Sequence, residues 1–145
     1  MKNKKILTNL IRGGLQRSNF SETSESLFLT SGFVYKTAED AEKSFKEEKE
    51  RFMYSRFGNP TVDTFQKRMA LLEGAEACWA TSSGMSALFT ILMSCLKKGD
   101  RVVSARALFG SCHFIITEIL PKFGIDIKLV DGSNLNQWEN ALKKK

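Results

Sequence analysis

Cysteine and histidine are scarce in this chain of 145 residues. The three cysteines, Cys78, Cys95 and Cys112, form no C-x-x-C pair, and His113 is the single histidine. Structural zinc sites and small disulfide scaffolds need closely spaced ligands or paired cysteines. We therefore expect no metal site and a core position for Cys78. A partly reactive thiol at Cys112, which follows a loop at the start of a helical pattern, stays open.

Long apolar runs are absent as well. No stretch of 18 apolar residues occurs, and the basic start MKNKK is followed by a segment too short and polar for a signal peptide. We expect a cytoplasmic protein with no membrane partner. The net charge is +6, but lysines and glutamates alternate, as in residues 46–50. Such mixing is typical of solvated helix faces, so we expect no nucleic-acid partner.

The first half of the chain has few regular patterns. Residues 27–35 predict an extended arm, and Thr37 predicts the cap of a helix that runs to about residue 50. Asn59-Pro60 combines a strong N-cap with the residue preferred in the first helical position. A helix is therefore expected from residue 60 to Gly74, which is a typical C-terminal cap.

Extended and helical patterns alternate in the second half. Three strands are expected at 76–80, 101–104 and 125–130, and helices at 85–96, 111–120 and 135–142. Pro121 ends or bends the second of these helices, and Ser133 or Asn134 caps the third. This alternation predicts an α/β fold with a mainly parallel sheet and crossover helices. Ligands of such sheets bind at the turns between the carboxyl ends of strands and the following helices.

One such turn has the sequence Thr-Ser-Ser-Gly-Met-Ser, residues 81–86. Amides at a helix start attract an anion, and Gly84 allows close approach of the backbone. The turn lacks the G-x-G-x-x-G pattern and the P-loop lysine, which disfavours a nucleoside triphosphate. A well-capped helix without any ligand is the equally open alternative.

Two further stretches suggest binding groups. In YSRFGNPT, residues 54–61, Tyr54 and Arg56 lie in a segment that Gly58, Asn59 and Pro60 keep out of regular helix. Arg56 could hold a phosphate bidentately, with the Tyr54 phenol as a second donor. Phe109 follows the second strand and could stack on a flat cofactor ring, although a core position is the alternative.

The stretches YSRFGNPTVDTFQKRMALLEGAE, ATSSGMSALF, LKKGDRVV and LFGSC together resemble the Cys/Met-metabolism family of fold-type I pyridoxal-phosphate enzymes. Within that family the chain is most similar to the O-succinylhomoserine sulfhydrylase branch. The resemblance implies an N-terminal arm, helix and inter-subunit loop over 1–58. It also implies the first part of a mainly parallel pyridoxal-phosphate-binding large domain over 59–145.

The resemblance also implies roles for single residues. Gly84 and Met85 resemble the pair whose amides hold the cofactor phosphate, and Tyr54 and Arg56 the pair that reaches it from a neighbouring subunit. A homo-oligomer, dimer or tetramer, is therefore expected. Phe109 stands where most relatives have a ring-stacking tyrosine, and this difference removes the phenol while it keeps the stacking.

The implied reaction is γ-replacement on O-succinylhomoserine by sulfide, which gives homocysteine for methionine biosynthesis. The Schiff-base lysine, the aspartate for the pyridinium nitrogen and the arginine for the substrate carboxylate have no counterpart in this chain. We therefore expect a truncated, association-prone chain that has no catalytic residue and is inactive alone. A cystathionine γ-synthase or γ-lyase fragment, and a non-catalytic oligomerising remnant, are the alternatives.

Overall fold

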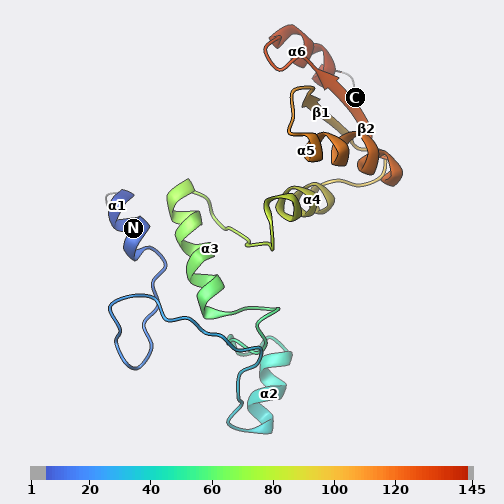
Figure 1. Cartoon of the computed structure of the whole chain (residues 1–145). Helices are drawn as coiled ribbons and strands as arrows, with labels where there is room; N and C mark the ends of the chain where they lie inside the picture. Colours follow the sequence, from blue (N-terminus) through green and yellow to red (C-terminus); the bar gives the residue numbers. More distant parts are fainter. Residues whose placement is uncertain (1–5, 144–145) are drawn as a thin grey trace. The chain divides into compact units, whose positions relative to one another are not determined.

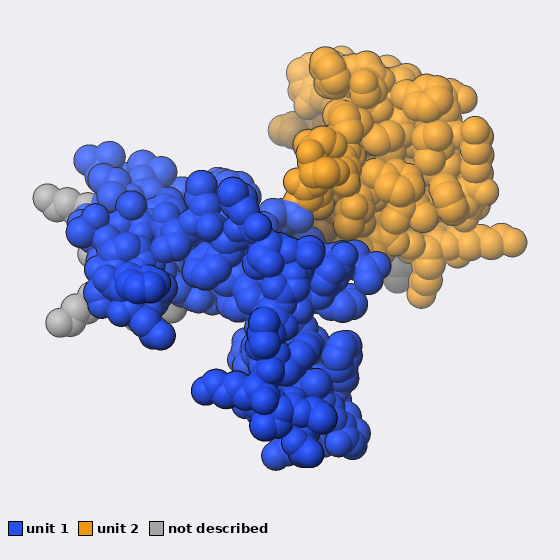
Figure 2. Space-filling model, turned by 60° about the horizontal axis from the view of Figure 1, so that its bottom comes forward, with its two compact units in different colours: residues 1–80 blue, residues 81–145 orange. Residues whose placement is uncertain are grey.

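A computed structural model gives the structure of the chain and describes residues 6–143 (Figure 1). The chain forms two compact units, residues 1–80 and 81–145 (Figure 2). Each unit is described by itself. The division at residues 58 and 59, which the sequence suggests, stays a prediction.

The first unit is organised by the helix α3, Pro60–Glu73. Asn59 is its N-cap and accepts a hydrogen bond from the Thr61 amide, and Gly74 caps its C-terminal end in the left-handed conformation. Both ends therefore lie where the sequence predicts. The short helix α1, Ile6–Arg12, lies beside α3 and was not predicted, because seven residues show too little periodicity.

The segment after α1 comes very close to α3. Gly14 has a φ of 69°, and a Cβ there would lie 2.8 Å from the Thr64 carbonyl oxygen, so only glycine fits without strain. The Arg68 guanidinium then holds this segment, through 3.0 Å from Nε to the Gly13 carbonyl oxygen and 2.7 Å from Nη1 to Glu25 Oε1. These contacts fix the path of the arm along α3.

The arm loops before it reaches the next helix. Within this loop, the Ser18 amide and hydroxyl and the Ser26 hydroxyl donate to the Glu22 carboxylate over 2.7–2.8 Å. These hydrogen bonds lower the pKa of Glu22 to about 2. Helix α2, Ala38–Phe45, follows and has the predicted Thr37 cap, with the Asp40 amide as donor, but it ends five residues before the expected residue 50.

The expected strand at 76–80 is wrong: in the described chain these residues have no strand partner and do not form a ladder. Trp79 is 75% exposed, and Cys78 is only half-buried and not in the core. The Ala80 amide instead donates to Gln66 Oε1 over 2.8 Å. An apolar extended segment becomes a strand only when a neighbouring strand accepts its hydrogen bonds.

The second unit contains a parallel pair of strands, as predicted. Strand β1, Arg101–Ala105, pairs with β2, Asp126–Val130, in a register that places Arg101 opposite Asp126. The hydrogen bond from the Arg106 amide to the Val130 carbonyl oxygen, 2.9 Å, extends the ladder past the carboxyl end of β1. Helix α6, Leu135–Lys143, follows β2, and the Asn134 side chain caps it by accepting from the Gln137 amide.

Four helical segments precede or connect these strands. Helix α4, Gly84–Cys95, leads to β1, and helix α5, Gly110–Phe114, follows it. The regular α-helix ends earlier than expected, because Ile115–Ile119 form a π-helical turn (η1) and Leu120–Phe123 a 3₁₀ turn (η2). Pro121 has no N–H for an α-helical bond, which explains the change of helix type just before it.

The core of the second unit lies on one face of the strand pair. Ile116, Leu120 and Ile125 are buried together, and half-buried side chains of α4, β1 and β2 pack around them. On the opposite face Val130, 2% exposed, lies beside α6. The strands are therefore covered by helices on both faces, as the alternating pattern predicts. No helix among residues 6–143 is long and apolar enough to span a bilayer.

Candidate functional site

The start of α4 has two backbone amides that the fold does not use. Ser83 is the N-cap: its Oγ accepts from the Ser86 amide over 3.1 Å, and its carbonyl oxygen accepts from the Ala87 amide over 2.9 Å. The amides of Gly84 and Met85 have no acceptor in the part of the chain that the structure describes. Helices leave their first amides free, and the macrodipole makes that end attractive to an anion.

Gly84 adds space to this turn. Apart from its chain neighbours and the backbone of its own helix, a Cβ at Gly84 would meet no atom within 4 Å, and the φ of Gly84 lies outside the left-handed region, so neither packing nor backbone strain in this chain requires glycine. The space that a side chain at residue 84 would take is therefore open. A phosphate ester fits this arrangement, because its oxygens accept from exposed amides at a helix start. The turn therefore fits the phosphate of the expected cofactor.

A second helix start lies next to the first. Cys112, in the short helix α5, has its Sγ 4.0 Å from the Met85 Sδ at the start of α4. Phe109 immediately precedes α5 and is 74% exposed, so the core alternative for this ring is wrong. The exposed ring is available for stacking at the end of the unit where both helices begin. The contact between Cys112 and Met85 was missed, since the sequence gives no signal that pairs two sulfurs 27 residues apart.

Tyr54 and Arg56 lie together on a turn of the first unit. The Arg56 Cζ lies 5.7 Å from the centroid of the Tyr54 ring and 5.0 Å from that of Phe57. Tyr54 forms an isolated antiparallel bridge with Gly32 of the arm. The structure thus brings Tyr54 and Arg56 to each other, and Met85 to Cys112 of α5. The contribution of both groups to one site stays a prediction.

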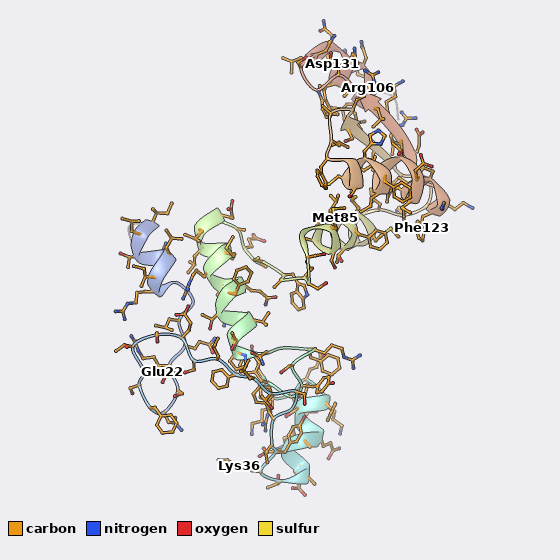
Figure 3. All side chains as sticks on the ribbon, in the orientation of Figure 1. Glu22, Lys36, Met85, Arg106, Phe123 and Asp131 are labelled. Carbon is orange, nitrogen blue, oxygen red and sulfur yellow. The ribbon has the colours of Figure 1, made fainter. Side chains whose placement is uncertain are left out.

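Charged side chains at and beyond the strands lie apart from the start of α4. Hydrogen bonds from Ser133 and, less strongly, the charge of Arg106 lower the pKa of Asp131 (Figure 3). A groove of about 480 Å³ runs along β1, β2 and α6, with Arg101, Lys128 and Asn140 in its lining. Neither Gly84, Met85 nor Phe109 lines this groove. Residues 6–143 contain no group of three or more metal-ligating side chains.

The α/β fold and the free amides at the start of α4 are compatible with a protein that binds a phosphorylated cofactor. The sequence model of the Cys/Met metabolism PLP-dependent enzymes matches residues 7–145, and this chain belongs to that family. The expected family, fold class and cofactor are thereby confirmed, since the family is defined by its dependence on pyridoxal phosphate.

Proteins from several bacteria are similar to most of the chain. O-Succinylhomoserine sulfhydrylase of Mycobacterium tuberculosis (strain H37Rv) is 54% identical over 132 residues, which are 91% of this chain and 32% of that protein. The protein of the same name from Pseudomonas aeruginosa is 43% identical over 136 residues, 94% of this chain and 34% of its own length. L-Methionine gamma-lyase of Fusobacterium nucleatum subsp. polymorphum is 36% identical over 137 residues, with 94% and 35% covered.

Solved structures show the same relationship. A Campylobacter jejuni protein assigned as an O-acetylhomoserine (thiol)-lyase contains N'-pyridoxyl-lysine-5'-monophosphate and superposes with a TM-score of 0.86 at 25% identity, over 95% of this chain and 34% of that one. Cystathionine gamma-lyase of Lactobacillus plantarum, solved with L-serine, gives a TM-score of 0.79 at 27% identity, over 95% and 34%. The chain thus spans about a third of the length of the relatives it matches.

Proposed function

We propose that this chain is the N-terminal part of a pyridoxal-phosphate-dependent O-succinylhomoserine sulfhydrylase. The reaction is γ-replacement: sulfide takes the place of succinate on the γ-carbon, which yields homocysteine for methionine biosynthesis in the cytoplasm. The observation that carries this proposal is the 54% identity over 132 residues to a protein of that name. The more distant relatives named methionine gamma-lyase make γ-elimination the second candidate.

Each proposed binding residue has a distinct task. The free amides of Gly84 and Met85 donate to the cofactor phosphate, and the α4 dipole adds to the attraction. The exposed Phe109 ring stacks on the cofactor ring. When bound, pyridoxal phosphate supplies an electron sink that stabilises negative charge next to its imine carbon. The chain's own residues orient and retain the cofactor by its phosphate and ring.

Tyr54 and Arg56 complete the site in a homo-oligomer. They belong to the unit that does not contain Gly84, and we propose that they bind the phosphate held by a neighbouring subunit. An arginine suits this task, since its guanidinium donates two parallel hydrogen bonds to phosphate oxygens. Because the residues that bind the cofactor covalently and pair with its ring nitrogen have no counterpart here, we propose that this chain alone is inactive.

A chimaera with the remaining two thirds of a relative tests the proposal. In it, this chain replaces the matching 132-residue stretch of the Mycobacterium tuberculosis relative. We expect homocysteine to form from O-succinylhomoserine and sulfide, as measured by product analysis. Formation of 2-oxobutanoate from methionine, without homocysteine synthesis, would instead establish γ-elimination as the reaction.

Arg56→Ala in the same chimaera tests the phosphate contact. Loss of a charge-assisted hydrogen bond predicts a pyridoxal-phosphate affinity roughly tenfold to a hundredfold weaker, measured by absorbance titration. Arg12→Ala removes an equal charge from the last turn of α1 and serves as the control. An Arg56→Ala protein with unchanged affinity would remove the basis for the inter-subunit contact.

A further inference from the structure

Asn59 makes more contacts than its role as a helix cap needs. Its side chain belongs to a residue that is only 6% exposed, and its Oδ1 accepts from the Thr61 amide over 2.9 Å. Its Nδ2 donates twice, over 2.9 Å to the Phe28 carbonyl oxygen and over 2.9 Å to Ser55 Oγ. All the strong hydrogen-bonding capacity of the amide nitrogen is thus used inside the first unit.

The choice of asparagine reflects these donations. A cap requires only an acceptor, which serine, threonine or aspartate supply equally well. None of these side chains can accept from Thr61 and also donate to both Phe28 and Ser55 in the observed geometry. The orientation of the amide follows as well, because the carbonyl oxygen of Phe28 needs a donor opposite it.

Ser55 links Asn59 to the binding loop, because it lies between Tyr54 and Arg56 in the sequence. The Ser55 hydroxyl, which accepts from Asn59, donates in turn to the Thr30 carbonyl oxygen. The Ser55 amide donates to the Ser31 carbonyl oxygen over 2.8 Å. The loop is therefore held between the arm on one side and the buried Asn59 amide on the other.

We infer that Asn59 is a positioning residue: its amide nitrogen locks the Tyr54–Arg56 loop onto the arm and thereby sets the affinity for the cofactor phosphate. The inference rests on the proposed function for the phosphate contact. The locking of the loop rests only on the described hydrogen bonds. Asn59 does not touch the cofactor and acts through Ser55.

Two variants separate positioning from capping. Asn59→Asp keeps the shape and the acceptor for Thr61 but turns an oxygen toward the Phe28 carbonyl, and Asn59→Ser keeps a cap without burying a charge. Thr61→Val is the matched control: it removes the acceptor of the Phe28 amide, 2.9 Å away, and leaves the Asn59–Ser55 bond in place.

The first measurement is amide hydrogen exchange on the full 145-residue chain. The Phe33 amide of the arm donates to the Met53 carbonyl oxygen over 3.2 Å and so reports on the contact between arm and loop. In both Asn59 variants we expect exchange at the Ser55 and Phe33 amides to rise by about tenfold or more, since the two hydrogen bonds donated by the Asn59 amide nitrogen are lost. Amides in the middle of α3 should keep their protection, because the cap remains. Equal acceleration of exchange in α3 and in the loop would show a general loss of stability and overturn the inference. Two other results would also overturn it: exchange at Ser55 that is the same in the variants as in the parent chain, and a parent chain in which the Ser55 amide is not protected.

The second measurement compares two ligands in the chimaera. Asn59→Ser should weaken pyridoxal-phosphate affinity and leave affinity for pyridoxal, which has no phosphate, unchanged; Thr61→Val should alter neither. Equal weakening for both ligands would overturn the phosphate-specific role. If Arg56→Ala has no effect on either ligand, the proposed function of the loop fails, while hydrogen exchange still decides whether Asn59 positions it.

Discussion

Gly84→Ala should affect the stability of the chain and its proposed cofactor affinity in different ways. The methyl group would meet no atom of the chain within 4 Å, and the backbone at Gly84 is outside the left-handed region. Alanine favours helix over glycine by up to about 1 kcal/mol. We therefore expect the free energy of unfolding of the chain to stay the same or to rise by up to about 1 kcal/mol.

Cofactor binding should change in the opposite direction. If the phosphate binds the Gly84 and Met85 amides as proposed, the added methyl group would hinder its close approach. Displacing the phosphate from one amide costs a charge-assisted hydrogen bond, worth about 1.5–3 kcal/mol. Since 1.4 kcal/mol corresponds to a factor of ten, affinity should fall roughly tenfold to a hundredfold.

Two assays decide the outcome. Chemical denaturation of the chain gives the stability, and absorbance titration of the chimaera with pyridoxal phosphate gives the affinity. Ser94→Ala is the control, because it also introduces alanine into α4 but lies in the last turn, away from the free amides. A Gly84→Ala chimaera that binds pyridoxal phosphate as tightly as its parent would refute the assignment of this helix start to the phosphate.

Other changes test the core, the arm and the ring. Leu120→Ala should lower the free energy of unfolding by about 2–5 kcal/mol because Leu120 is fully buried, whereas Leu135→Ala, at an 80% exposed position, should change it by less than about 0.5 kcal/mol in denaturation experiments. Because the folded chain lowers the pKa of Glu22 from about 4.5 to about 2, the carboxylate binds protons more weakly than in the unfolded chain. The stabilisation it gives is therefore present above pH 4.5 and is lost as the pH falls toward 2; protease sensitivity of residues 18–26 should rise over that window, and Glu22→Gln should abolish this dependence. Phe109→Ala should leave the stability of the chain within about 0.5 kcal/mol and weaken cofactor affinity up to about tenfold through lost stacking, as titration of the chimaera would show.

Local sequence signals predicted the elements whose ends are chemically marked. Asn59-Pro60 and Gly74 define both ends of α3, a short apolar run marks β1, and alternating apolar residues mark β2. Each of these signals acts within a few residues. The strand expected at 76–80 failed because a strand depends on its neighbours, and α1 was missed because it is held by its contacts with α3 rather than by its own periodicity.

In the candidate site too, local features were predictable from the sequence and features that depend on the fold were not. The free amides of Gly84 and Met85 follow from helix geometry and were predictable from the turn sequence. The exposure of Phe109 was not predictable from the sequence, since most aromatic rings in proteins are largely buried. The hydrogen bond from Asn59 to the Phe28 carbonyl oxygen of the arm also escaped prediction, because it joins residues 31 positions apart whose approach only the fold specifies.

The exposed apolar surface of helix α4 affects how much of the newly synthesised chain stays intact in a cell. None of its side chains is fully buried in the structure described, and Ile91 remains 57% exposed although the helix is almost entirely apolar. Chaperones and proteases select apolar segments of this kind, so they compete for the newly made chain. The amount that accumulates in a cell should therefore depend on whatever covers α4, and co-expression with such a covering polypeptide should raise the yield of intact protein.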